Sequence, residues 1–526
     1  MSSDSSTRSP VESILDDETT ARFDDRARSR VFRSVQDVVD VVGTTIGPYG
    51  RDKLIVNNGG NVSVTNDAAT ILRNLHLTDP VARVIGDLAN SQIYNAGDGT
   101  TTTILFAGAL LDRAADLGER GLHPTTIIRG YEHASEVALD RLRAVATTHD
   151  IADRAVAVDV AETTLRGTNA TQLHGPLAEL AVDAVERVTD GYDVDLNAIR
   201  LRTALGRDLA DSQLVEGGTV EGVPAGEPAD HPTGTITLAL LDDEVAPNEA
   251  SRDVSIAAEN AESLSAFVDA ERSRTAGLAD AVSALGVDLL VCTGGVDDAV
   301  RSRLAKRGTT CLSTVSDPDM RFLSRVFGLA PRTSVDDLDP GAVGEAVVAY
   351  DRATGRTTLT TSDPGAVTVQ LFGQTEAYLD EIDNTVSDAI EVVARVASDG
   401  RVLAGGGAPE MAMATRVRSD ATGVDGREQL AALAFADALE TVPRSIATNA
   451  GFDATDVLLS LRSAHSTGQE TAGIDAETGA VGDTAAAGVR EPFVVKRYAV
   501  THAVEAVRTL LRIDGIVEAK EIEPAT

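Results

Sequence analysis

The segment Gly97-Asp98-Gly99-Thr100-Thr101-Thr102-Thr103 decides how the rest of this sequence is interpreted. It leads into apolar residues at helical spacing from Ile104 to Leu117, so its backbone N–H groups stand at the positive end of a helix dipole. Together with the threonine hydroxyls they would cradle an anion and leave Asp98 available for Mg²⁺. An ordinary turn with an N-cap residue explains the same sequence, so an anion-binding loop and a plain turn both stay open as interpretations.

Two further glycine turns have a similar character. The first is Thr45-Ile46-Gly47-Pro48, and the second is Gly405-Gly406-Gly407, which precedes a predicted helix from Pro409 to Val417. A flexible helix entry explains such glycines without any ligand. The string GxxxxGK[ST] occurs nowhere in the sequence, so none of the three turns is a P-loop.

Two aspartates complete the chemical inventory. Asp67 follows a predicted hairpin, and Asp388 lies in a predicted helix of residues 378–397. Phosphoryl transfer to water needs a metal ion at the phosphates and a carboxylate that orients the water. Each aspartate taken alone is explained as a solvated surface charge. If these residues form one pocket, the loops near residues 45, 67 and 98 must meet the loop near residue 406, so the middle of the chain is an insertion.

The apolar pattern supports such an insertion. Helical spacing dominates from Val31 to about residue 148, where Gly47-Pro48 is expected to stop the first helix, and again after residue 376. Within the first stretch, an Asn57-Asn-Gly-Gly60 turn between the strand-like residues 53–56 and 62–64 predicts a hairpin. The strand-like segments of the middle are residues 235–241, 287–292 and 309–315. Helical segments at 296–306 and 317–327 alternate with the last two, which indicates an α/β module.

The composition excludes some classes of partner. A formal charge of -36 argues against nucleic acid, because binding phosphates there needs a basic face. The acid is spread along the chain, aromatics are 3%, tryptophan is absent and only four residues are lysine. Such a surface suits a very salty cytoplasm, since in molar salt the Debye length falls to about 3 Å. A patch for basic partners would instead need long acidic runs, which are not apparent.

Length and the remaining residues set further limits. A chain of 526 residues with 43% hydrophobic content is expected to form about three domains. There is no apolar run of roughly 20 residues and no secretory signal at the start, so we expect a cytoplasmic protein without a membrane partner. Cys292 and Cys311 lack a CxxC or Cys/His pattern and are predicted to be small buried hydrophobic residues.

Taken together, the motifs resemble those of the group II chaperonins, the thermosome or TCP-1 family, in a somewhat divergent haloarchaeal form. The resemblance runs from about residue 30 to 520. The segments that carry it are Thr45-Ile-Gly-Pro-Tyr-Gly-Arg-Asp-Lys53, Asn66-Asp-Ala-Ala-Thr-Ile-Leu72, Gly97-Asp-Gly-Thr-Thr-Thr102, His123-Pro-Thr-Thr-Ile-Ile-Arg-Gly-Tyr131, Ala404-Gly-Gly-Gly-Ala-Pro-Glu410, Ala436-Asp-Ala-Leu-Glu440, Asn449-Ala-Gly451, Gly488-Val-Arg-Glu-Pro-Phe-Val-Val-Lys496 and Leu511-Arg-Ile-Asp514.

The resemblance implies a multidomain α and α/β protein with the chaperonin fold. Its parts would be a mostly helical equatorial ATPase domain, an intermediate hinge domain, and an α/β apical substrate-binding domain with a helical lid protrusion. The implied boundaries are a disordered tail at 1–28, the equatorial domain at 29–147 and 402–526, the intermediate domain at 148–213 and 364–401, and the apical domain at 214–363 with the lid at about 244–276.

The same resemblance implies an ATP-dependent chaperone that encapsulates and folds non-native proteins. Its partners would be like or related subunits in a double ring of eight- or nine-membered rings, and its cofactors ATP and Mg²⁺, with K⁺ as a further candidate. The implied roles are Asp67 and Asp388 for positioning the hydrolytic water, Asp98 for magnesium and the nucleotide, and Thr45, Ile46, Gly47, Pro48, Gly99, Thr100, Thr101, Thr102, Gly406 and Glu491 for the nucleotide. Hydrolysis would then drive lid closure.

The sequence departs from the family pattern beside this site. Ala68 stands where the family usually has Gly, and Ile93-Tyr94-Asn95 replaces acidic residues. Thr168 occupies the place of a lysine that senses the γ-phosphate; Arg166 is a nearby substitute of different geometry. These departures favour an alternative, a slow or inactive accessory subunit of a mixed ring with a structural or holding role. A third reading, a metabolic ATPase that uses the α/β centre, lacks a GxGxxG fingerprint.

Overall fold

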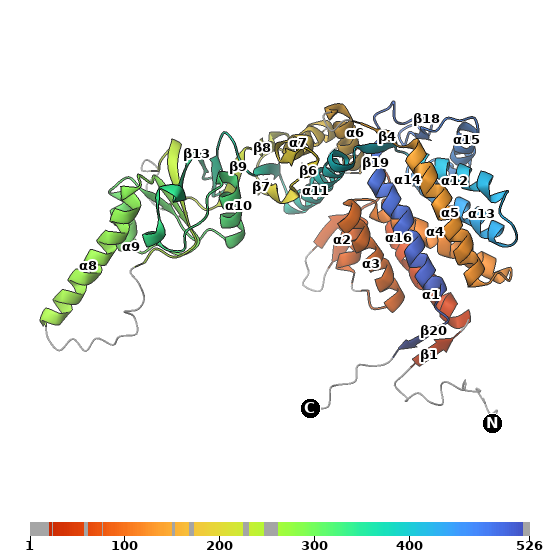
Figure 1. Cartoon of the computed structure of the whole chain (residues 1–526), viewed down its shortest axis with the longest axis horizontal. Helices are drawn as coiled ribbons and strands as arrows, with labels where there is room; N and C mark the ends of the chain where they lie inside the picture. Colours follow the sequence, from red (N-terminus) through yellow and green to blue (C-terminus); the bar gives the residue numbers. More distant parts are fainter. Residues whose placement is uncertain are drawn as a thin grey trace, which may run out of the picture. The chain divides into compact units, whose positions relative to one another are not determined.

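The structure is a computed structural model that describes residues 20–23, 25–56, 62–75, 77–149, 153–167, 173–224, 231–246 and 261–518 (Figure 1). The chain divides into two compact units. Unit 1 is Met1–Ala178 with Asn384–Thr526, and unit 2 is Glu179–Asp383. Unit 1 is therefore assembled from both ends of the chain. The three-domain boundaries stay a prediction.

Unit 1 is mainly helical. Its helices are α1 (Asp25–Val42), α2 (Ala68–Asn74), α3 (Pro80–Ala96), α4 (Thr100–Glu119), α5 (Pro124–Val145), α6 (Arg154–Leu165), α12 (Ala408–Ala421), α13 (Glu428–Leu439), α14 (Thr441–Asn449), α15 (Ala454–Ser466) and α16 (Phe493–Leu511). Two more helices, α7 (His174–Arg187) and α11 (Glu376–Asp399), contain residues of both units. The helices predicted from the apolar spacing are thus confirmed with shifted ends, except that the helical spacing around Glu440 is divided between α13 and α14.

Short antiparallel pairings join distant parts of unit 1. The strands are β1 (Thr20–Phe23) with β20 (Gly515–Glu518), β2 (Lys53–Val56) with β3 (Val62–Thr65), β17 (Ala472–Ile474) with β18 (Val481–Asp483), and β16 (Arg401–Ala404) between β19 (Arg490–Pro492) and β4 (Thr147–Thr148). The predicted hairpin is confirmed as β2–β3, although its turn at 57–61 lies outside the described residues.

Two local expectations need correction. The tail predicted for residues 1–28 is too long, because Thr20–Phe23 pairs with the end of the chain and α1 begins at Asp25. A partner about 500 residues away leaves no local signal. The first helix also ends at Val42, followed by a 3₁₀ turn at Gly43–Thr45, before the Gly47-Pro48 stop.

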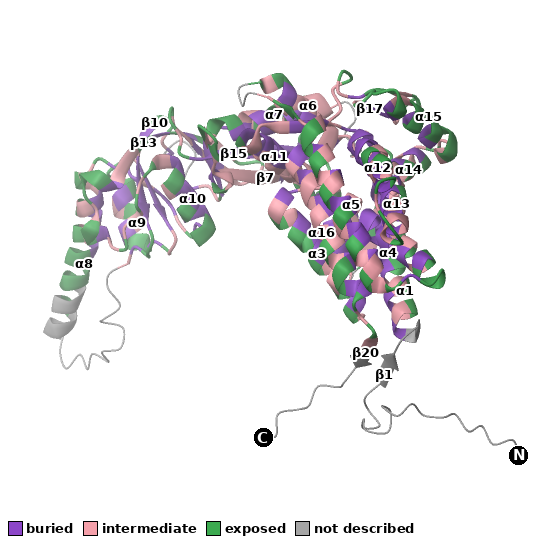
Figure 2. Cartoon of the chain, turned by 45° about the vertical axis from the view of Figure 1, so that its right-hand side comes forward, coloured by how far each residue is buried: buried purple, intermediate pink, exposed green. Residues whose placement is uncertain are grey.

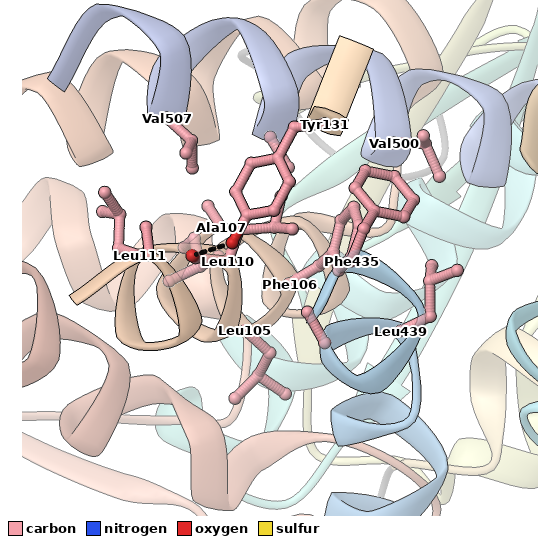
Figure 3. Close-up of a cluster of buried hydrophobic side chains, with 14 of the residues drawn as sticks. Leu105, Phe106, Ala107, Leu110, Leu111, Tyr131, Phe435, Leu439, Val500 and Val507 are labelled. Atoms are coloured by element: carbon pink, nitrogen blue, oxygen red, sulfur yellow. Dashed lines mark hydrogen bonds between the residues drawn. The ribbon is translucent and has the colours of Figure 1, made fainter. Parts of the chain in front are cut away.

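The core of unit 1 is centred on aromatic rings between α4, α5 and α13 (Figure 3). Phe435 packs edge-on against Phe106 at 5.2 Å and against Tyr131 at 5.9 Å between ring centroids. The Tyr131 hydroxyl donates to the Leu110 carbonyl at 2.8 Å, so the only polar atom of its ring is satisfied. Burial raises the pKa of Tyr131 far above its usual value. This core holds rigid the helices that carry the candidate site.

The described residues of unit 2 form a six-stranded sheet, a three-stranded sheet and a two-stranded pair, β5 (Thr189–Asp190) with β6 (Asp193–Val194). The six-stranded sheet has the order β12 (Thr310–Leu312), β11 (Leu289–Cys292), β10 (Gly234–Leu241), β13 (Val343–Asp351), β14 (Arg356–Thr360), β9 (Gly217–Glu221). The three-stranded sheet has the order β7 (Ile199–Leu205), β15 (Val367–Gly373), β8 (Gln213–Val215). The strand pairs β10–β11 and β11–β12 are parallel, with α8 (Ala261–Ala284), α9 (Asp298–Ala305) and α10 (Asp317–Phe327) interleaved along the chain. The predicted α/β module is confirmed.

Buried residues line the strands of unit 2 as well as the helices of unit 1 (Figure 2). Cys292 and Cys311 are buried free thiols, as expected, and burial raises their pKa values to about 12 and about 11. The predicted lid at 244–276 falls partly outside the described residues, because 247–260 are not described; from Ala261 the chain forms α8. In the described ranges, no helix is long and apolar enough to cross a membrane.

Candidate functional site

The loop between α3 and α4 is closed by two left-handed glycines. Gly97 ends α3 with φ 77° and Gly99 precedes α4 with φ 87°, conformations that favour glycine. A Cβ on Gly99 would lie 2.6 Å from Val495 Cγ1 and 3.0 Å from Gln92 Nε2. Because the N-cap residue is Gly99, α4 has no side-chain cap in the part of the chain that the structure describes. The buried Thr100 hydroxyl has no hydrogen-bond partner among the described residues. These features fit an anion at the end of a 20-residue helix.

Gln92 holds this loop in place. The side chain is fully buried, and its Nε2 donates to the Asp98 carbonyl at 2.8 Å and to the Val495 carbonyl at 3.2 Å. Its Oε1 lies 3.0 Å from His502 Nδ1. Because both Nε2 hydrogens are used, Oε1 accepts and His502 Nδ1 donates. Sequence reasoning missed Gln92; the only signal was a polar residue five positions before the first glycine in a helical pattern.

The turn at Thr45–Pro48 lies beside the start of α4. The Thr45 hydroxyl donates to the Val42 carbonyl at 2.8 Å and lies 3.3 Å from the Thr101 hydroxyl. Asn449 Nδ2 donates to the Ile46 carbonyl at 2.9 Å, which fixes the turn against α14. Gly47 adopts φ 83°. Two of the three glycine turns singled out in the sequence therefore meet at the threonine hydroxyls.

The three predicted aspartates share one electrostatic environment. Asp67 caps α2 by accepting from Ala69 N at 3.3 Å and Thr70 N at 2.6 Å. Burial raises the pKa of Asp98, and the charge of Asp67 raises it further. Burial also raises the pKa of Asp388 well above its usual value, with added contributions from Asp67 and Asp98. The structure thus brings together three carboxylates from three separate parts of the chain.

Glu391 is a fourth carboxylate that sequence reasoning missed. A Cβ on Gly97 would lie 2.7 Å from Glu391 Oε2, so Glu391 packs directly on the loop that carries Asp98. Burial raises the pKa of Glu391, Arg395 opposes this rise, and Asp98 adds to it. Glu391 lies three residues after Asp388 on α11, a spacing that places both on one helix face. This spacing is the sequence feature from which Glu391 could have been identified.

The carboxylates of this site fit Mg²⁺ only if phosphates and water supply most of its ligands. Within the described ranges, no group of three or more His, Cys, Asp or Glu side chains could hold a metal ion. Mg²⁺ in phosphate-transfer sites is usually held by one or two carboxylates together with substrate phosphates and water. Asp98, at the loop before the uncapped helix, fits that pattern.

The third glycine turn joins a buried ionic cluster. Gly406 has φ 67°, and a Cβ there would lie 2.8 Å from the Ile474 carbonyl oxygen. Glu491 accepts from Lys496 Nζ at 2.5 Å, and Lys496 also pairs with Glu410 at 2.9 Å. Burial alone would lower the pKa of Lys496, but the two glutamates raise it above its usual value.

Glu491, which the resemblance assigns to the nucleotide, therefore has a charged partner within the protein. Burial raises its pKa, while Lys496 lowers it. Lys496 also lowers the pKa of Asp98, so this cluster lies within electrostatic reach of the loop. Lys496 and Glu410 were missed as functional residues, since nothing in their local pattern pairs them.

The departures from the family pattern lie around this site. Ala68 is buried with 1% exposure. Tyr94 is 84% exposed, and Asn95 donates to the Ser91 carbonyl, so neither side chain packs into the loop. Thr168 lies outside the described residues. Arg166 Nη2 lies 3.8 Å from Glu162 Oε2 on the same helical turn.

Comparisons with known proteins agree with this geometry. The model of the TCP-1/cpn60 chaperonin family matches residues 38–521. A thermosome subunit of Methanopyrus kandleri is 38% identical over 95% of this chain and 94% of its own length. Thermosome subunit 2 of Haloferax volcanii is 38% identical over 97% and 93%, and thermosome subunit alpha of Halobacterium salinarum is 35% identical over 97% and 91%.

Proposed function

We propose that this chain, which belongs to the TCP-1/cpn60 chaperonin family, is an ATP-dependent group II chaperonin subunit that hydrolyses ATP with Mg²⁺ to fold non-native proteins. It would act in a double ring of like or related subunits, each ring having eight or nine members, in a salt-adapted cytoplasm. Relatives from halophilic archaea support that setting.

The observation that carries the proposal is the composition of the site in unit 1. An uncapped helix start with a buried, unpartnered Thr100 hydroxyl lies on the loop of Asp98, and Asp67 and Asp388 lie within electrostatic reach. A phosphate chain supplies the acceptor oxygens that the helix N–H groups and hydroxyls need. The carboxylates would be incompatible with phosphates unless a cation lay between them.

The roles of the residues follow from this arrangement. Bound at Asp98 and the phosphates, Mg²⁺ would neutralise charge that builds up during phosphoryl transfer. Thr100, Thr101 and the amides of the loop would orient the phosphates. Asp388, whose raised pKa makes it a stronger base than a free aspartate, would hold the attacking water and accept its proton. Asp67, held by its cap, would fix that water from the other side.

The coupling to folding is a further part of the proposal. Asp388 belongs to α11, in the segment that the predicted boundaries assign to the intermediate domain. Movement of that segment would bring the base to the nucleotide or withdraw it, and so tie hydrolysis to lid closure.

The direct test is ATP hydrolysis in about molar KCl. We expect Mg²⁺-dependent turnover that falls at least about 100-fold in Asp388→Asn and Asp98→Ala. Asp87→Asn, at an exposed position of α3, is the matched control and should retain activity. An assembled ring without turnover in the parent protein would refute the ATPase proposal and favour an accessory subunit.

A further inference from the structure

Three arginines in unit 2 surround a single buried carboxylate. Arg200 and Arg202 lie on β7, and Arg356 begins β14. Arg200 Nη1 donates to Asp319 Oδ1 at 2.5 Å, and Arg202 Nη2 donates to the same oxygen. Asp319, near the start of α10, is 5% exposed. Its one carboxylate therefore serves two guanidinium groups.

Arg356, the third arginine, has only a weak ion pair to balance its positive charge. Arg356 Nη2 lies 3.9 Å from Glu221 Oε1, and the Glu221 side chain is 76% exposed. A pair of this kind contributes little, because water and salt screen it. Burial lowers the pKa of Arg356 and the charge of Arg202 lowers it further, whereas the charges of Glu221, Asp351 and Asp319 raise it. Arg356 thus belongs to the same local group, in which Asp319 is the only one of these three carboxylates that is buried.

Two donors of this group are unused. Arg202 Nε and Arg356 Nη1 are buried and have no hydrogen-bond partner among the described residues. An unsatisfied buried donor is costly, and more so on a charged group. These two donor atoms are themselves shielded from solvent, whereas the side chains of Arg202 and Arg356 are 26% and 17% exposed, so a rotation of the side chains would present the donors to a small ion.

We propose that Arg202 and Arg356, supported by Arg200, form a binding site for a small oxyanion of the phosphate type. Guanidinium groups present donors in a planar fork that matches the oxygens of phosphate, whereas chloride offers a single centre. The Arg200 guanidinium is set by its donation to the Pro318 carbonyl at 2.8 Å and by Phe322, whose ring centroid lies 4.2 Å away. The site lies wholly in unit 2, so it is independent of the proposed nucleotide site.

The test measures phosphate binding to the assembled protein. Thermal unfolding of unit 2 is followed against inorganic phosphate at constant potassium concentration, with chloride as the replaced anion. Saturating non-hydrolysable ATP analogue with Mg²⁺ occupies the proposed nucleotide site. We expect phosphate to raise the unfolding temperature, and Arg356→Gln and Arg202→Lys to weaken the apparent phosphate affinity about 10- to 100-fold, the loss of one charge-assisted hydrogen bond.

Two further variants keep the result decisive. Arg301→Gln removes an arginine of α9 that pairs with Asp298, so it should retain the phosphate effect. Asp319→Asn removes the competing carboxylate and should tighten phosphate binding. No stabilisation beyond that of chloride, or equal stabilisation in the parent, Arg356→Gln and Arg202→Lys, would overturn the assignment.

Discussion

Gln92 offers the sharpest test of how the phosphate loop is built. The change Gln92→Glu keeps the size of the side chain but replaces both donated hydrogen bonds with a carboxylate that faces the Asp98 and Val495 carbonyls. An unsatisfied buried acceptor costs about 1–3 kcal/mol, so the loss of two donors should destabilise unit 1 by about 2–6 kcal/mol at pH 8. Affinity for Mg²⁺-nucleotide should fall with it, because the Asp98 peptide loses its anchor.

The pH dependence of the stability of unit 1 should be reversed in Gln92→Glu. Burial lowers the pKa of His502 below its usual 6.5, so in the parent the folded state resists protonation and loses stability as the pH falls through about 6.5. In Gln92→Glu, a carboxylate would face Nδ1 at about the 3.0 Å of the present contact and should raise the pKa of His502 above its usual value. Protonation would then favour the folded state, and the penalty of the substitution should shrink from pH 8 to pH 6.

The assay is thermal unfolding between pH 6 and pH 8, together with the affinity for a fluorescent ATP analogue. Gln92→Leu removes the new carboxylate as well as the amide, and the double variant Gln92→Glu, His502→Gln removes its partner, so neither should show the reversal. Parent-like nucleotide affinity at pH 8, or an unchanged pH slope in Gln92→Glu, would refute the role given to this amide.

Three other changes probe the carboxylates and the buried cluster. Glu391→Gln should lower the pKa of Asp388 by removing a neighbouring charge, and so move the acidic limb of the ATPase pH profile to lower pH; an unmoved limb would contradict this. Asp388→Asn should abolish turnover and yet raise nucleotide-free stability by roughly 1–2 kcal/mol at pH 8, measured by thermal unfolding, because it relieves repulsion and burial of charge. Lys496→Met should cost about 3–5 kcal/mol in the same measurement, since Glu410 and Glu491 would lose their shared cation; a smaller loss in the double variant with Glu491→Gln would support that cause.

Much of the fold could be predicted because its elements carry local signals. The helix of 317–327 has a Ser316 N-cap and Pro318 in its first turn, and it was predicted to the residue. The helical spacing found after residue 376 does not show the break at Glu440, which separates α13 from α14 and whose carboxylate binds Arg418 and Arg462. An interruption stabilised by distant arginines leaves no trace in the apolar spacing.

In the candidate site, too, contacts between distant residues could not be predicted from the local sequence pattern. Asp67, Asp98 and Asp388 could be proposed because each stands in a recognisable string, but nothing local links Gln92 to His502 or Lys496 to Glu410. Those contacts bridge residues that are 410 and 86 positions apart, and they exist only once α16 packs beside α3 and its Lys496 reaches Glu410 of α12. Hydrogen-bond partners of buried side chains are properties of the packed structure, whereas caps and glycine turns are properties of the chain.

The charges of the surface and of the site should respond to different ions. The carboxylates spread over the surface repel one another through water, and molar salt screens that repulsion within about 3 Å. Asp98, Asp388 and Glu391 are partly withdrawn from water, as their raised pKa values show, so dissolved salt screens their mutual repulsion much less. A cation bound among phosphates can relieve it directly. Raising KCl should therefore stabilise the whole chain, whereas Mg²⁺ with nucleotide should stabilise unit 1 even when KCl is already saturating.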